Sequence, residues 1–158
     1  PWRERIRSAL NAAAFYAFWY PRQWLPFGGG APADMHPRLA GYMAEVAARS
    51  RRMARPLFHQ IVRHGVKLEK RQVQLARVAD IGADLFALAA TCVYAQKLLK
   101  DGEPAAKVFM LVDDFHAQAR QRIDRNFHDI GHNADDHGYA LAQQVINGEH
   151  QWLERGIV

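Results

Sequence analysis

The chain has 158 residues, of which 49% are hydrophobic and 23% are charged, with 21 Lys and Arg against 16 Asp and Glu. This composition is typical of a globular protein, and the length suits one domain with one core. The single cysteine, Cys92, excludes an internal disulfide and a cysteine-rich zinc site. The longest uncharged runs, 8–21 and 85–96, are shorter than the about 18 apolar residues of a membrane-spanning helix.

The net charge of +5 is divided unequally along the chain. Residues 1–77 carry 14 Lys and Arg and 4 Asp and Glu, whereas residues 78–158 carry 7 and 12, so the halves are +10 and −5. A basic half can serve an anionic partner such as a lipid surface or a nucleic acid. It can also be neutralised internally if basic helices pack beside acidic ones. Because the imbalance is split in this way, we favour internal pairing or a lipid surface over nucleic acid.

The first predicted helix is outlined by Trp2, Ile6, Leu10 and Ala13. A dense aromatic segment follows, and the stretch 21–37, rich in Pro and Gly, is the one long loop that we expect. Tyr and Trp have apolar bodies and polar tips, which suit a membrane–water interface and also protein interfaces. The candidate interface residues are Phe15, Trp19, Tyr20, Arg22, Trp24 and Phe27.

Three long amphipathic helices are predicted next. The first covers 37–64, with Gly65 as its cap and with Pro56 expected to kink or split it. The second ends before Gly102, and its apolar or small face consists of Leu75, Val78, Ala79, Gly82, Leu85, Phe86, Ala89, Cys92, Val93, Gln96 and Leu99. The third starts near Pro104, and its face consists of Val108, Leu111, Val112, Phe115, Ala119, Ile123, Phe127 and Ile130.

Short turns at Gly65 and at 101–102 make these helices antiparallel neighbours. The sequence therefore predicts an all-α, up-and-down bundle of four-helix type with long helices, completed by the N-terminal helix. A shorter helix at 139–146 should end near 147–148. We expect one domain, with residues 1–35 forming the N-terminal helix and loop, and residues 36–158 forming the bundle core and a tail rich in His and Asp. Because the chain begins at Pro1 without Met or a signal-peptide pattern, we expect it to be part of a longer, intracellular protein.

The tail contains the densest group of metal-type ligands. His128 and His132 are four residues apart, which places two imidazoles on one helix face, and Asp136 could add a carboxylate. The first histidine lacks the adjacent glutamate of HExxH, and the first half of the chain offers no matching Glu-x-x-His pair. A solvated helix end is therefore the preferred interpretation. We assign no catalytic residue, because no nucleophile, acid–base pair or phosphate-binding loop is visible, and Cys92 lies in an apolar stripe that suits a core residue.

Residues 57–103 resemble the additional C-terminal helical domain of very-long-chain acyl-CoA dehydrogenases and their relatives. The resemblance extends more weakly over 36–125, including His36–Pro37 and the 102–106 turn, and includes the run RVAD at 77–80. The residues that carry it are His64, Gly65, Glu69, Gln72, Leu75, Arg77, Ala79, Asp80, Asp84, Leu85 and Ala87.

The resemblance implies that the parent protein is a flavin-dependent acyl-CoA dehydrogenase of fatty-acid β-oxidation, whose FAD and catalytic glutamate lie in an upstream core. No catalytic or cofactor-binding residue is carried over to this chain. The resemblance also implies a role in subunit organisation, as a homo-oligomer, and association with an anionic membrane surface. The alternatives are a free-standing helical interaction or ligand-binding module and a metal-binding bundle.

Overall fold

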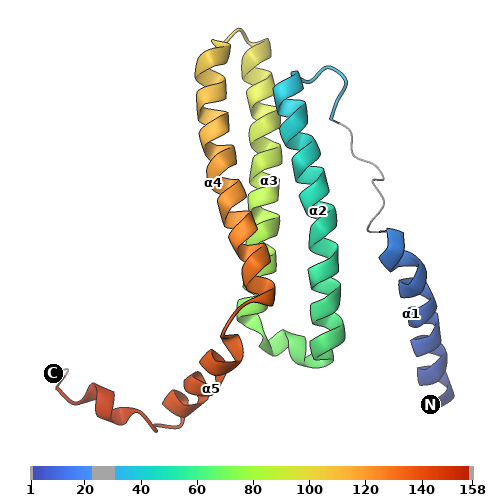
Figure 1. Cartoon of the computed structure of the whole chain (residues 1–158), viewed down its shortest axis with the longest axis vertical. Helices are drawn as coiled ribbons and strands as arrows, with labels where there is room; N and C mark the ends of the chain where they lie inside the picture. Colours follow the sequence, from blue (N-terminus) through green and yellow to red (C-terminus); the bar gives the residue numbers. More distant parts are fainter. Residues whose placement is uncertain (1, 23–30, 157–158) are drawn as a thin grey trace.

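In the computed structural model, residues 2–22 and 31–156 are described, and this part of the chain contains helices and no strand. Three long helices stand side by side: α2 (Pro37–His64), α3 (Gln72–Lys100) and α4 (Ala105–Gly131) (Figure 1). The shorter elements are α1 (Trp2–Arg22), η1 (Gly65–Lys70), α5 (Asp135–Ile146) and η2 (Gln151–Glu154). The all-α bundle with long antiparallel helices is therefore confirmed.

Glycines end the helices at the turns where they were expected. Gly65 caps α2 with φ of 53°, and Gly102, in the turn from α3 to α4, has φ of 91°. Side chains other than glycine rarely adopt these left-handed conformations. At the start of α2, Pro37 follows His36, whose Nδ1 accepts a hydrogen bond from the Arg38 backbone N–H at 3.2 Å.

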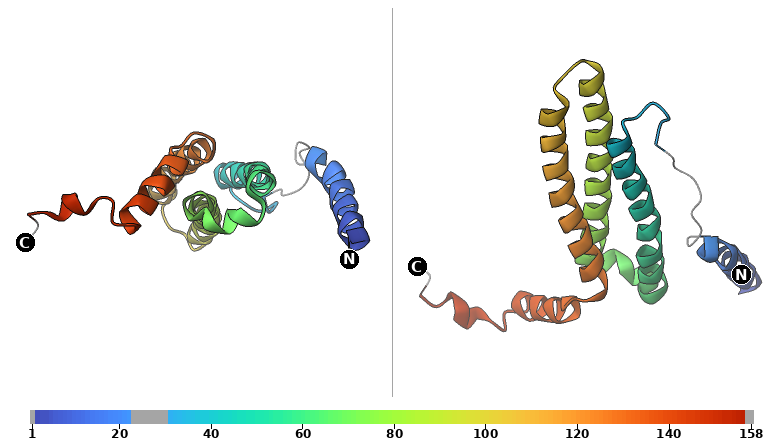
Figure 2. Two further views of the ribbon diagram at one scale, coloured as in Figure 1. Left: turned by 90° about the horizontal axis from the view of Figure 1, so that it is seen from below. Right: turned by 45° about the horizontal axis from the view of Figure 1, so that its top comes forward.

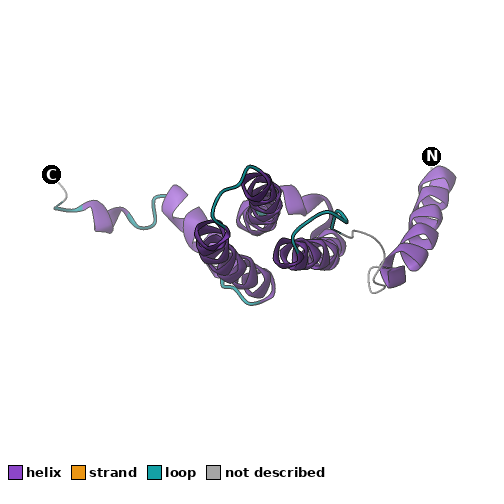
Figure 3. Ribbon diagram, turned by 90° about the horizontal axis from the view of Figure 1, so that it is seen from above, coloured by secondary structure: helices purple, strands orange, loops and turns teal. Residues whose placement is uncertain are grey.

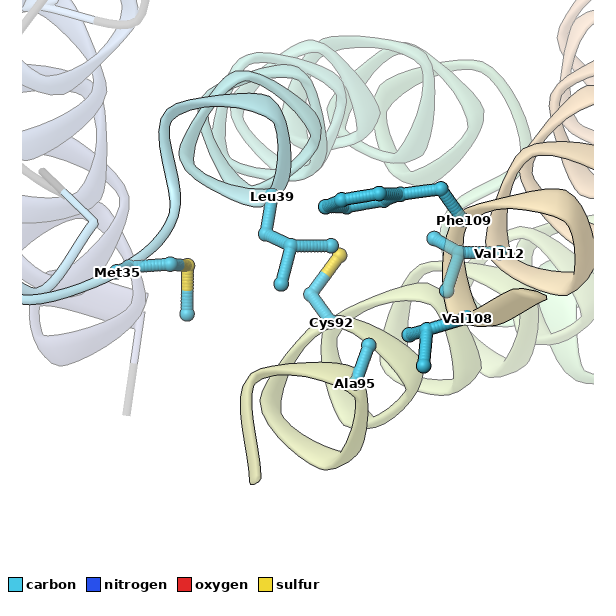
Figure 4. Close-up of a cluster of buried hydrophobic side chains, with 7 residues drawn as sticks. All are labelled: Met35, Leu39, Cys92, Ala95, Val108, Phe109 and Val112. Carbon is cyan, nitrogen blue, oxygen red and sulfur yellow. The ribbon is translucent and has the colours of Figure 1, made fainter. Parts of the chain in front are cut away.

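The bundle core consists of two clusters stacked along the three helices. The first joins α2, α3 and α4 at the end of the bundle near the α3–α4 turn (Figure 4), and its buried residues are Met35, Leu39, Cys92, Ala95, Val108, Phe109 and Val112. The second joins α3 and α4 further along, and its buried residues are Ile81, Leu85, Leu88, Ala119, Ile123, Phe127 and Ile130. Met35, which precedes α2, therefore packs with the bundle core.

The N-terminal helix differs from the expectation that it would complete a four-helix bundle. Viewed along the bundle, α2, α3 and α4 form a compact triangle, and α1 and α5 lie outside it on opposite sides (Figures 2 and 3). Most described side chains of α1 are exposed, with Leu10 at 64% and Phe18 at 79%. The core is therefore built by three helices, and α1 is an additional helix beside them.

Three local details also differ. Helix α2 continues through Pro56 as one helix, so the proline does not split it. The connection that begins at Gly65 is the six-residue helix η1 rather than a short turn, and it separates α2 from α3. Helix α5 begins at Asp135, four residues before the predicted start, because the Asn133 side chain accepts a hydrogen bond from the Asp135 N–H at 3.1 Å.

Candidate functional site

The aromatic segment lies on α1 and makes contact with α2. The rings of Tyr16 and Trp19 lie 4.8 and 5.7 Å from the ring of Phe58, and the hydroxyl of Tyr20 is 2.9 Å from Nε2 of His59. Two of the predicted interface residues, Trp19 and Tyr20, therefore pack within the chain.

Another face of α1 carries exposed aromatic residues. Phe15 is 61% exposed, Phe18 is 79% exposed, and the predicted interface residue Arg22 is exposed as well. These three residues are spaced to share one helix face. Trp24 and Phe27, which the sequence also indicated, lie outside the described residues.

The predicted metal ligands are only partly brought together. The rings of His128 and His132 stack with centroids 4.5 Å apart, as their spacing required. The carboxylate of Asp136 instead forms an ion pair with Arg71, and Nδ1 of His128 lies 3.1 Å from Asp129. Across the described ranges, 2–22 and 31–156, no group of three or more His, Cys, Asp or Glu side chains is arranged to hold a metal ion.

Ion pairs between the basic and acidic halves hold the helices together. Arg49 of α2 contacts Asp124 of α4 at 2.5 Å, and Arg77 of α3 contacts Asp135 of α5 at 2.5 and 2.9 Å. Arg38 likewise pairs with Asp113. Part of the charge asymmetry is therefore neutralised by pairing within the chain.

The electrostatic effects of these pairs follow from their geometry. Hydrogen bonds from Arg77 hold the pKa of Asp135 below its ordinary value, and those from Arg49 do the same for Asp124. Burial raises the pKa of the Cys92 thiol, so the neutral form is favoured, as suits a core residue.

A buried polar group joins α2 and α4 beside these pairs. The ring of His116 stacks on Tyr42 with centroids 4.0 Å apart, and its Nε2 lies 2.9 Å from Glu45. Burial raises the pKa of Glu45, but hydrogen bonds from Arg49 and His116 outweigh it and leave the pKa lowered. This group was not predicted from the sequence. The signal for it was the presence of the titratable residues Tyr42, Glu45 and His116 on the inner faces of α2 and α4.

An exposed apolar surface on α3 and α4 was also missed. Leu111 was predicted to lie in a core stripe, yet it is 74% exposed and lines this surface. Phe86 and Val93 of the predicted α3 stripe are also exposed, at 76% and 57%, but they do not line it, and Val93 borders a separate groove beside Met35. An open groove of about 370 Å³ runs between the two helices, and its lining is mostly apolar: Thr91, Tyr94, Ala95, Leu98, Glu103, Lys107, Val108, Leu111, Val112 and Phe115. The apolar stripes are thus wider than the contacts made within this chain.

Helix α3 is apolar over most of its circumference. It is the one helix in the described part of the chain that is long and apolar enough to cross a membrane, and 28% of its most apolar 18-residue window is buried. The lengths of the uncharged runs did not predict this, because scattered charges interrupt the apolar positions of α3. Helix α3 also has Ile81, Leu85 and Cys92 inside the bundle, and its Asp84 binds Arg122 of α4 at 2.7 Å. These contacts are those of the central helix of a bundle.

Comparison with known proteins agrees with this architecture. The family model described as "ACAD9/ACADV, C-terminal domain" matches residues 37–150, which cover the three long helices and α5. The chain is 35% identical over 160 residues to proteins named "Probable acyl-CoA dehydrogenase FadE10" from Mycobacterium bovis and Mycobacterium tuberculosis. The match covers 99% of this chain and 24% of each relative, so the chain spans about a quarter of their length. No solved structure was found to match. The chain therefore belongs to the ACAD9/ACADV C-terminal domain family, within the acyl-CoA dehydrogenases.

Proposed function

We propose that this chain is a non-catalytic accessory domain that packs against the dehydrogenase core of a flavin-dependent acyl-CoA dehydrogenase and contributes to its subunit assembly. The observation that carries the proposal is the exposed apolar surface of α3 and α4 around Tyr94 and Leu111. Exposed apolar patches of this kind are typical of surfaces that are covered by another protein.

The proposed occupant of this surface is the rest of the same protein. The relatives are about four times as long as the matched region, so a large segment is available to cover it. Glu103 and Lys107 lie at the groove among its apolar residues, which gives a packing partner polar groups for orientation.

The oxidation of acyl-CoA in β-oxidation is assigned to the core of the parent protein. When bound there, FAD accepts the hydride of such a reaction. No FAD contact is assigned to the residues of this chain.

A second role, association with an anionic membrane surface inside the cell, is favoured by one observation. Phe15 and Phe18 are exposed on the face of α1 that bears Arg22, an arrangement typical of interfacial helices. Vesicle co-sedimentation of the full-length protein tests this role. Phe15→Ala plus Phe18→Ala should reduce binding, and unchanged binding would contradict the role.

The packing role is tested with two matched variants of the full-length protein. Leu111 in the groove and Ile146 on α5 are each 74% exposed, so an Asp at either site should be equally harmless if neither is covered. We expect Leu111→Asp to loosen the domain and accelerate its release by limited proteolysis, whereas Ile146→Asp should not. Equal behaviour of the two variants would overturn the proposal.

The alternatives make different predictions. A free-standing helical interaction or ligand-binding module requires a reading frame that begins near Pro1, whereas the accessory domain requires a flavoenzyme core upstream. A metal-binding bundle using His128, His132 and Asp136 requires stoichiometric metal in the purified protein, which elemental analysis measures. A nucleic-acid partner requires steeply salt-dependent binding.

A further inference from the structure

A second groove, separate from the apolar surface, lies between α2 and α4 and extends to the end of α1. Its volume is about 430 Å³. Tyr20 comes from α1, and α4 contributes Phe127, Ile130 and Gly131. The remaining lining residues recur along one face of α2 and are Arg52, Arg55, Pro56, His59, Gln60 and Arg63.

The groove has a strong positive charge. Three arginines line it, and its described lining contains no Asp or Glu. The guanidinium of Arg52 lies over the ring of Phe127, with Cζ 4.5 Å from the ring centroid, which fixes the position of the charge. One turn away, Arg49 is bound to Asp124, so that carboxylate is already neutralised. The arginines of the groove are therefore placed to bind an anion.

Gln60 adds a second and independent requirement. Its side chain is 8% exposed, and its Nε2 donates to the backbone oxygen of Ile130 at 3.4 Å. Its Oε1 is buried and has no hydrogen-bond partner. A buried acceptor without a partner is destabilising, and a donor on a ligand would supply the missing hydrogen bond. The groove therefore suits an anion that also carries a hydrogen-bond donor.

We propose that this groove binds a phosphate monoester. Its oxygens accept hydrogen bonds from Arg52 and Arg63. Near neutral pH a monoester is partly protonated, since its second pKa is about 6. The remaining P–OH can donate to Oε1 of Gln60. The same group occurs on soluble phosphate esters and on the headgroup of phosphatidic acid.

Sulfate provides a sharp test of the role of Gln60, because it has the charge and shape of phosphate but no O–H near neutral pH. Titration calorimetry of the full-length protein with inorganic phosphate, glycerol 3-phosphate and sulfate should show both phosphates binding about tenfold more tightly than sulfate, as one hydrogen bond allows. Gln60→Leu should abolish this preference. A preference that survives Gln60→Leu would overturn the proposal.

The arginines are tested with variants matched in charge. Arg52→Gln plus Arg63→Gln, at two exposed positions, should weaken binding of glycerol 3-phosphate at least about tenfold. Lys67→Gln plus Lys70→Gln removes the same charge from exposed sites on η1 and should leave binding unchanged. If both double variants weakened the binding of glycerol 3-phosphate equally, binding would depend only on net charge, and the proposed site in the groove would be refuted.

The source of the phosphate is distinguished with phosphatidylcholine vesicles that contain or lack phosphatidic acid. Binding only to vesicles that contain phosphatidic acid, with competition by glycerol 3-phosphate, would identify a lipid headgroup. Binding of glycerol 3-phosphate without vesicle binding would identify a soluble ester. Each of these results supports the site, and failure to bind either form would refute it.

Discussion

The attachment of α5 gives the most direct quantitative test of the structure. No residue of α5 is buried, so its position depends on polar contacts. The central one is the pair between Arg77 and Asp135, whose side chains are 17% and 9% exposed and whose two hydrogen bonds measure 2.5 and 2.9 Å. Next to it, Asp136 pairs with Arg71 but is 74% exposed.

The difference in burial sets the expected magnitudes. A hydrogen bond to a charged group contributes about 1.5–3 kcal/mol, and Asp135→Asn removes the charge but keeps one acceptor, so we expect a loss of about 2 kcal/mol. That loss raises the population of detached α5 roughly thirtyfold. An exposed pair contributes about 0–1 kcal/mol, so Asp136→Asn should change this population by a factor of about five at most.

Hydrogen exchange of the backbone amides of α5 measures this population. We expect Asp135→Asn to accelerate exchange in α5 strongly, Asp136→Asn to do so weakly, and neither to change exchange in α3. Equal acceleration by the two variants would refute the reasoning from burial. Unchanged exchange in Asp135→Asn would show that α5 is held by other contacts.

Three further predictions concern the bundle. Ile123→Ala, at a fully buried site, should lower the free energy of unfolding by about 2–5 kcal/mol in urea titration, and a loss below 1 kcal/mol would contradict the core assignment. Gly102→Ala, at φ of 91°, should destabilise by about 1–2 kcal/mol, whereas Gly41→Ala inside α2, where a Cβ meets no atom within 4 Å, should stabilise by about 0.5–1 kcal/mol; thermal unfolding compares them. Hydrogen bonds from Arg49 lower the folded-state pKa of Asp124 below its ordinary value of 3.8. The Asp124 carboxylate therefore contributes its full stabilisation of the fold above about pH 4 and loses it as the pH falls through the lowered pKa. The stability of Asp124→Asn in acid-unfolding experiments should lack this pH-dependent loss.

Helical periodicity was sufficient to predict the fold class and the turns, because glycine conformation and apolar spacing are local properties. Periodicity alone cannot say which apolar residues are covered by the same chain. Cys92 and Leu85 are buried as predicted, whereas Phe86 and Leu111 were assigned to the same kind of stripe and are exposed. The exposed Leu111 marks an apolar surface that extends beyond the contacts made within the bundle.

The candidate sites show the same limit. Spacing predicted that the rings of His128 and His132 would meet, and they do. It could not predict that Asp136 would pair with Arg71, 65 residues away in the sequence. The burial of Gln60 against Ile130 also depends on the packing of α2 on α4. Contacts between distant segments therefore account for most of what the sequence did not reveal.

The central claim is that the dehydrogenase core covers the apolar groove of α3 and α4. Thiol labelling of the full-length protein tests it, with Leu111→Cys in the groove compared with Lys67→Cys on η1, because both positions are exposed in this chain. We predict that the thiol at position 67 reacts rapidly and that the thiol at position 111 is protected, as judged by mass spectrometry of the labelled peptides. Equally rapid labelling at the two positions would contradict the account.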